Sequence, residues 1–83
     1  MTTEEMEKKI QKQIKKIKKM GYKKTFLGVK EVMHIIGVSE STLYNWRKNG
    51  VGPEYSRNNS PKARIRYRIE TIARFMIETI ETA

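Results

Sequence analysis

The chain has 83 residues, the size of one small domain, and its 18 Lys and Arg residues against 9 acidic residues give a net charge of +9. The absence of Cys excludes a disulfide framework and a thiolate metal site, and no apolar run approaches the roughly 18 residues that a membrane-spanning helix needs. A small, strongly basic chain without a signal-peptide pattern indicates a polyanionic partner, nucleic acid in particular, and a cytoplasmic, nucleoid-associated protein.

The first 20 residues are predicted to form a lysine-rich amphipathic helix. Thr2 or Thr3 can cap its start, and Gly21 can end it. On a helical wheel, a stripe about 120° wide collects the apolar residues Met6, Ile10, Ile14, Ile17 and Met20. The rest of the surface is charged, because residues 8–24 contain nine lysines and no acidic residue.

Two properties of this helix stay open at the level of sequence. The apolar stripe suits docking on the rest of the domain, or pairing with a second copy, better than a membrane surface, because it lacks aromatic residues. The lysines suit either a solvated face or an arm that contacts phosphates. Residues 1–20 are therefore treated as one segment, and residues 21–83 as a domain expected to close its core without that segment.

A helix-turn-helix is predicted after this segment. Apolar residues at i, i+3, i+4 and i+7 predict a first helix over residues 29–36, with one buried face made by Val29, Val32, Met33 and Ile36. Gly37 ends that helix, and Ser39 is a strong N-cap for a second helix over residues 40–49. The second helix turns three side chains toward the first: Thr42, Leu43 and Trp46. Two short helices joined by a tight Gly-Val turn form a helix-turn-helix.

The outer face of the second helix carries the chemistry that a DNA groove requires. Within about 100° of the helical wheel it presents hydroxyl, amide and ammonium groups, with a guanidinium at its flank: Ser41, Tyr44, Asn45, Lys48 and Arg47. An amide can bond an adenine edge with two contacts, and the cations suit phosphate or guanine. The alternative interpretation is an ordinary helical hairpin with a polar outer face.

The segment after the second helix predicts a small wing. In RIRYRI (residues 64–69), arginines alternate with Ile65, Tyr67 and Ile69, which is the period of a strand whose arginines face outward. Residues 58–61 predict a turn, so residues 55–57 are the expected partner strand. A plain solvated edge is the alternative interpretation. A last helix is expected to cover this hairpin with one apolar face: Ile69, Ile72, Phe75, Met76 and Ile80.

The predicted fold is mainly α with a small β-hairpin, a winged helix-turn-helix preceded by an N-terminal amphipathic helix. The residues expected to contact DNA are Ser41, Tyr44, Asn45, Arg47, Lys48, Lys30, Arg57, Lys62, Arg64 and Arg66. No enzyme is expected, because the one histidine, His34, has no Cys or Asp to partner it, and no glycine-rich phosphate loop is present. No cofactor, metal ion, small-molecule substrate or membrane partner is expected. His34 is interpreted as a surface residue or a phosphate contact.

From residue 26 to residue 77 the chain resembles a family of small winged helix-turn-helix proteins, the phage excisionases and AlpA-type regulators, related in fold to the MerR DNA-binding domain. The resemblance lies in FLGVKEVMHIIGVSESTLYNWRKNG and RIRYRIETIARFM. The chain departs from the family pattern at Tyr67, where Trp is usual, at Arg47, where an apolar residue is frequent, and at Glu70 and Thr71, where a Ser or Asp cap is frequent. The resemblance implies sequence-specific DNA binding, with the second helix reading bases and the hairpin on the backbone or in the minor groove.

Three functions stay open on the sequence alone. The first is a transcriptional regulator from a phage or other mobile element that binds double-stranded DNA. The second is an architectural factor in recombination or packaging, such as an excisionase or the DNA-recognition part of a terminase small subunit. The third is a protein–protein adaptor whose amphipathic first helix is the interface. The sequence also leaves open whether the protein forms a homodimer or a cooperative oligomer on DNA.

Overall fold

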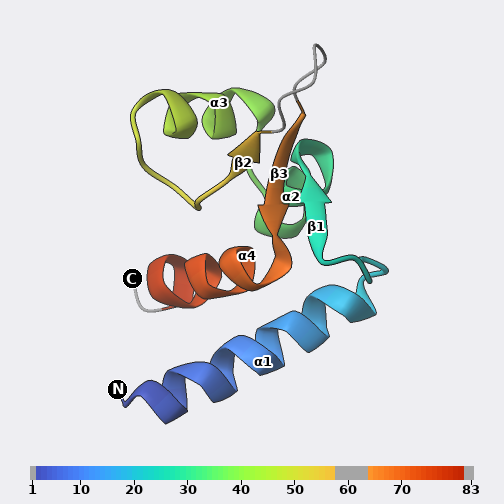
Figure 1. The fold of residues 1–83 in the computed structure, drawn as a ribbon, viewed down its shortest axis with the longest axis vertical. Coiled ribbons are helices and arrows are strands. Elements are labelled where there is room, and N and C mark those ends of the chain that lie inside the picture. The colour runs from blue at the N-terminus through green and yellow to red at the C-terminus, as the bar shows by residue number, and fades with distance from the viewer. Residues whose placement is uncertain (1, 58–63, 82–83) are drawn as a thin grey trace.

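Helices make up most of the structure, a computed structural model that describes residues 2–57 and 64–81 (Figure 1). The helices are α1 (Thr3–Lys19), α2 (Val29–Ile36), α3 (Glu40–Lys48) and α4 (Ile69–Phe75), which continues as a π-helical segment, η1 (Met76–Glu81). The strands are β1 (Phe26–Gly28), β2 (Ser56–Arg57) and β3 (Ile65–Arg68). The predicted fold class, a mainly helical chain with a winged helix-turn-helix, is confirmed.

The strands form one antiparallel sheet in the order β1-β3-β2, with β3 in the middle. The alternation expected along β3 is present. Tyr67 is buried and pairs with the buried Leu27, while Arg66 and Arg68 are exposed. The inner face of the sheet therefore joins the core, and the outer face presents arginine side chains.

Two details of the sheet correct the expectation from sequence. The sequence does not reveal β1, because three residues are too few to show a period of two, and their extended state depends on pairing with β3. The outer strand begins at Ser56 and not at Tyr55, so β2 has two residues where residues 55–57 were expected. The turn expected over residues 58–61 lies outside the described residues.

The two helices of the predicted motif are present and begin where expected. α2 ends at Gly37, whose φ of 83° is the left-handed conformation that favours glycine. α3 begins after Ser39, whose hydroxyl accepts the Thr42 N–H at 3.1 Å. Leu43 is fully buried, and Asn49 is the C-cap of α3 instead of its last residue. The cap therefore fixes where α3 begins, and the buried leucine anchors the helix in the core.

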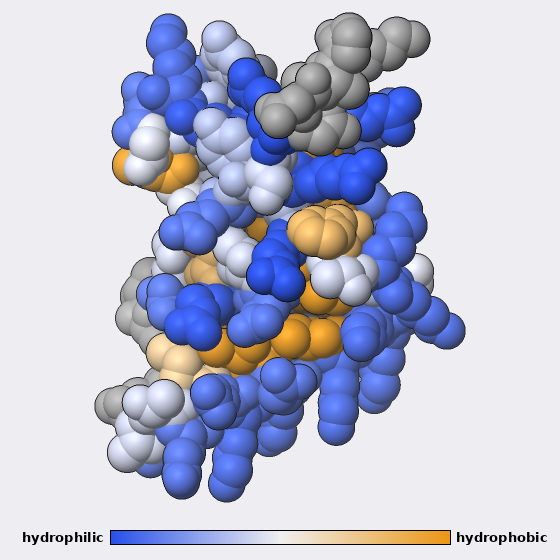
Figure 2. Space-filling model, in the orientation of Figure 1, coloured by the Kyte–Doolittle hydropathy of each residue, from blue (hydrophilic) through white to orange (hydrophobic). Residues whose placement is uncertain are grey.

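α1 packs along α4, which covers the middle of its apolar stripe, while Met20 at the end of the stripe stays 47% exposed. Ile10 and Ile17 are 2% and 0% exposed and belong to the same hydrophobic cluster as Ile72. The side-chain amide of Gln13, also buried, donates to the Met76 sulfur at 3.5 Å. Figure 2 shows a hydrophobic seam between α1 and α4. Of the uses left open by the sequence, docking on the rest of the chain is the one that the structure shows.

α4 lies between α1 and α3 (Figure 1) and contributes side chains to both contacts. Toward α3, the Phe75 ring lies 5.4 Å from the Trp46 ring, centroid to centroid. Ile72 is fully buried, as expected, but the predicted apolar face omits Ile77, which is 1% exposed. The predicted face of α2 likewise omits Ile35, which is 7% exposed. Which side chains of these two helices are buried therefore depends on tertiary packing and does not follow from the helical wheel alone.

We expect Ile17→Ala to lower the free energy of unfolding by about 2–5 kcal/mol, because the substitution empties a fully buried site in the shared core. Lys16→Ala is the matched control on the same helix turn, because Lys16 is exposed and its truncation should change stability by less than about 0.5 kcal/mol. Urea unfolding followed by circular dichroism measures both. Equal stabilities would mean that residues 21–83 close their core without α1.

Candidate nucleic-acid interface

The outer face of α3 presents polar side chains to solvent. Four residues expected to contact DNA are exposed there: Ser41, Tyr44, Asn45 and Lys48. Within residues 2–57 and 64–81, none of these side chains has a hydrogen-bond or ion-pair partner. The hydroxyls of Ser39 and Thr42, on the other side of the helix start, instead lie 2.9 Å apart and are bonded to each other. The outer face is therefore available to bond a ligand.

A shallow hollow along this face brings a carboxylate, Glu40, next to the residues expected to contact DNA. It is lined by Glu40, Ser41, Tyr44, Asn45 and Arg47. The set predicted from sequence omits Glu40, although Glu40 lies one helical turn before Tyr44 on the same side of α3. A carboxylate repels phosphate but can accept a hydrogen bond from the amino group of cytosine in the major groove. The face thus offers both donors and acceptors to base edges.

Arg47 differs from its neighbours because its guanidinium is engaged inside the domain. It donates to the Tyr67 hydroxyl at 2.9 Å and lies 5.9 Å from the centre of the Tyr55 ring. These contacts join the C-terminal half of α3 to the sheet. A guanidinium has five N–H donors, so a DNA contact by Arg47 stays a prediction alongside this structural role.

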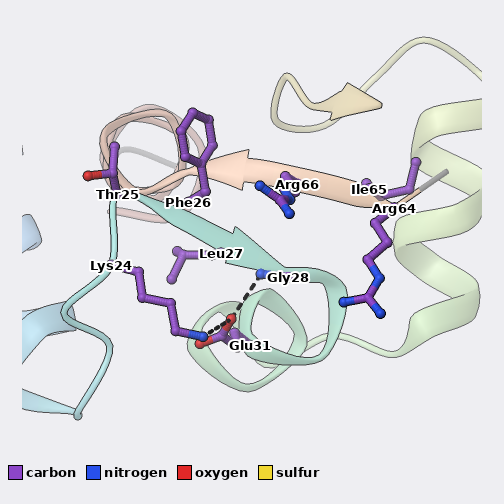
Figure 3. A pocket seen from close by; sticks show the side chains of 9 residues that line it. All are labelled: Lys24, Thr25, Phe26, Leu27, Gly28, Glu31, Arg64, Ile65 and Arg66. Atoms are coloured by element: carbon purple, nitrogen blue, oxygen red, sulfur yellow. Dashed lines mark hydrogen bonds and ion pairs between the residues drawn. The ribbon is translucent and has the colours of Figure 1, made fainter. Parts of the chain in front are cut away.

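The outer side of the sheet carries two of the arginines expected in the wing. Arg64, just before β3, and Arg66, within it, are both exposed. Figures 1 and 3 show that the end of β3 beside Arg64 lies near α3. Arg68, at the other end of β3, lies 5.8 Å from the centre of the Phe26 ring. Arg64 therefore lies at the end of β3 that is near α3, and Arg66 follows it on the same outer side of the strand.

Three other residues of the predicted set lie apart from this pair. Arg57 is exposed but pairs with Ile65, so it lies on the opposite face of the sheet from Arg66. Lys30 is exposed in the first turn of α2. Lys62 lies outside the described residues. Arg57 and Arg66 thus lie on opposite faces of the sheet. The sequence pattern of β3 alone does not indicate this, because it depends on the register between β2 and β3.

A hollow beside β1 brings further charges next to Arg64 and Arg66 (Figure 3). The Glu31 carboxylate accepts the Gly28 N–H at 3.0 Å and pairs with the Lys24 ammonium at 3.5 Å. The bond to Gly28 satisfies a backbone donor at the start of α2. Lys24, which the predicted set omits although it ends the lysine run, is thereby held at the edge of this hollow.

A comparison of the sequence with models of known protein families agrees with the helix-turn-helix that α2 and α3 form. The family model described as a helix-turn-helix domain matches residues 26–79, well over half of the chain. The chain belongs to this helix-turn-helix domain family. The match begins at β1, includes both helices of the motif and ends within η1, so α1 lies outside it. Membership of this small DNA-binding family implies DNA binding. No curated protein and no solved structure matches the chain.

In this helix-turn-helix domain, a glycine sets the path from α3 to β2. Gly52 has a φ of 81°, a conformation that side chains other than glycine rarely adopt. A Cβ at this position would lie 2.8 Å from Cε3 of Trp46. The chain therefore passes directly against the tryptophan ring, and the next residue, Pro53, is buried.

His34 is exposed on α2, as expected, and has a neighbour. Its Nδ1 and the Tyr22 hydroxyl oxygen are 2.5 Å apart, which links α2 to the segment after α1. A phosphate contact by His34 stays a prediction. In the described ranges, no group of three or more His, Cys, Asp or Glu residues is placed to hold a metal ion. The helices of those ranges include none that is long and apolar enough to cross a bilayer.

We expect Arg47→Ala to lower the free energy of unfolding by about 1.5–3 kcal/mol, the range for a hydrogen bond that involves a charged group. The substitution removes the donor to the buried Tyr67 hydroxyl. Lys48→Ala, at the next and exposed position, should change stability by less than about 0.5 kcal/mol. Chemical denaturation compares the two. If they unfold alike, the bond to Tyr67 does not stabilise the domain.

Proposed function

We propose that this helix-turn-helix protein recognises specific sequences of double-stranded DNA, with α3 in the major groove and the β2–β3 arm on the backbone or in the minor groove. We propose further that it is a transcriptional regulator from a phage or other mobile element, that it works on the nucleoid in the cytoplasm, and that it is not an enzyme. The observation that carries the proposal is the outer face of α3, where four polar side chains are exposed and have no partner in the described ranges.

The chemistry of this face supports sequence readout. Asn45 can donate to and accept from one adenine in the major groove, which fixes both the base and its orientation. Glu40 can accept from cytosine, and Lys48 can meet guanine or a phosphate. These side chains belong to a helix whose opposite side holds the fully buried Leu43. A rigid support of this kind keeps the reading groups in a fixed geometry, which specific recognition needs.

The charge distribution supports binding to the DNA backbone. Arg64 and Arg66 are exposed on the outer side of β3 and have no carboxylate partner among the described residues. Lys24 lies on the rim of the hollow that they share. Contacts from these cations to phosphates would add affinity without sequence preference and would fix the orientation of α3 in the groove.

The adaptor hypothesis loses the feature that suggested it. An interface through α1 requires the apolar stripe of that helix, but Ile10 and Ile17 are already buried against the rest of the chain. The architectural hypothesis uses the same α3 and strand surfaces as the regulator. A circular-permutation assay of DNA bending on the bound site separates them, because a recombination or packaging factor is expected to bend its site and a simple repressor is not.

We expect the affinity for duplex DNA to fall steeply with salt. If about five to eight phosphates are neutralised, the slope of log affinity against log salt concentration should be about −5 to −7. Arg64→Ala and Arg66→Ala should each reduce the steepness of this slope by about one. Fluorescence anisotropy across a salt series measures these slopes. A slope near zero for the unsubstituted protein would contradict an electrostatic interface.

We expect Asn45→Ala to cost about 1–3 kcal/mol of binding to a selected site and to relax the preference at one base position, because it removes a bidentate amide. Stability should hardly change, because Asn45 is exposed. Asn49→Ala is the matched control, since it removes an exposed amide just beyond α3. The measurement is the affinity ratio between the selected and a scrambled duplex. An unchanged ratio for Asn45→Ala would place the reading face elsewhere.

A further inference from the structure

α1 carries a line of lysines on the side that faces away from the rest of the chain. Four of them follow the spacing i, i+4, i+7, i+11, which puts their side chains on one line along a helix: Lys8, Lys12, Lys15 and Lys19. All four are exposed. The buried residues of α1 lie on the opposite side of the helix: Ile10, Gln13 and Ile17. We call the four lysines the lysine ridge.

The lysine ridge and the outer face of α3 point in opposite directions. α4 separates the two helices, because Gln13 of α1 bonds to Met76 and Trp46 of α3 packs on Phe75. Figure 1 shows α1 and α3 at opposite ends of the longest dimension of the molecule, which measures 41 Å. A straight duplex held by the outer face of α3 therefore does not reach the lysine ridge.

No ion pair in the described part of the chain engages the lysine ridge, although Glu4 and Glu7 line the same surface hollow as Lys8, Lys12 and Lys15 at the start of the helix. The acidic residues of α1 occupy only positions 4, 5 and 7, before the ridge. From Lys8 to Lys19 the helix rises about 16 Å. Duplex DNA carries one negative charge per about 1.7 Å of its axis, so every ammonium of the ridge can meet a phosphate. Figure 2 shows that the surface over α1, below the hydrophobic seam, is hydrophilic.

The composition of the ridge favours a phosphate backbone over other anionic partners. Protein interfaces are depleted in Lys and depend on aromatic or Arg anchors, and α1 contains neither residue type. A membrane-surface helix needs a free apolar face, but Ile10 and Ile17, in the middle of that face of α1, are buried in the core that α1 shares with α4. Flexible ammonium groups that act as point charges suit a regular array of phosphates.

We propose that the lysine ridge binds the phosphate backbone of a second DNA segment while α3 holds the first, so that one molecule bridges two duplexes. The second segment needs no particular sequence, because the ridge presents only ammonium groups and contacts only phosphates. The inference rests on the proposed function, since α3 must hold the first duplex. The protein thereby joins a recognised site to neighbouring or distant DNA.

The test is capture of a second duplex by the full chain. The protein is bound to an immobilised duplex that carries a selected site, and a fluorescent duplex of unrelated sequence is then added. We expect the second duplex to be captured. Its apparent affinity should fall roughly 150-fold between 50 and 200 mM salt, because four phosphate contacts give a log–log slope of about −3.6.

The deciding variant carries Gln at all four positions of the lysine ridge, which keeps a good helix former and removes the charge. It should lose at least tenfold in capture of the second duplex and stay within about twofold of the unsubstituted protein in binding one selected site. The control variant removes four exposed lysines away from the ridge: Lys9→Gln, Lys16→Gln, Lys18→Gln and Lys23→Gln. The control should retain capture within about threefold.

Several results would overturn the inference. Equal losses in the two variants would mean that total charge, and not the ridge, holds the second duplex. Capture that survives in the ridge variant would assign bridging to a dimer with two α3 faces. Loss of single-site binding in the ridge variant would place the ridge on the first duplex. Binding to vesicles of phosphatidylserine and phosphatidylcholine, without capture of DNA, would make the partner a lipid surface.

The proposed function and the inference fail in different ways. A protein that binds one duplex but captures no second one keeps the proposed function and loses the inference. A protein that binds no duplex at all loses the proposed function itself.

Discussion

Tyr67 is buried in the middle strand of the sheet, and its hydroxyl needs a hydrogen-bond partner there. Arg47 supplies the donor from α3, and the Tyr55 ring packs 6.2 Å from the ring of Tyr67. Because Arg47 follows Asn45 by about half a helical turn, the bond that satisfies Tyr67 also helps to set the rotation of α3 about its axis, and with it the direction in which the exposed Asn45 points. The orientation of the outer face of α3 therefore depends on a contact made on the inner side of the sheet.

α4 is the shared support of the helices, because both α1 and α3 pack against it. A domain of this size buries a limited fraction of its surface, so additional apolar contacts matter. The family match leaves out α1, yet Ile17 of α1 is fully buried in the same cluster as Ile72 of α4. α1 thus enlarges the core of the helix-turn-helix domain with one side and leaves its charged side in solvent. A substitution that weakens the packing of α4 would therefore weaken its contacts with α3 and with α1 at the same time.

The sequence predicts the parts of the structure that local interactions determine. The bounds of α2 and the start of α3 follow from a left-handed glycine, a serine cap and a helical apolar period, and all three act within a few residues. The position of β1 does not follow, because its extended state comes from pairing with β3, about 40 residues later. The bond between Arg47 and Tyr67 is equally non-local. Glu40 could have been found, because the helical wheel already places it beside Tyr44.

Gly52 and Trp46 constrain each other, because the backbone of one lies where a side chain would meet the ring of the other. A substitution at one of these two positions therefore changes which residues the other can tolerate. A relative with a side chain at the position of Gly52 must adopt the left-handed conformation there and also carry a smaller residue at the position of Trp46, or else approach β2 along a different path. Correlated substitution at these two positions would thus identify relatives in which the angle between α3 and the strands has changed, even where the residues on the outer face of α3 are the same.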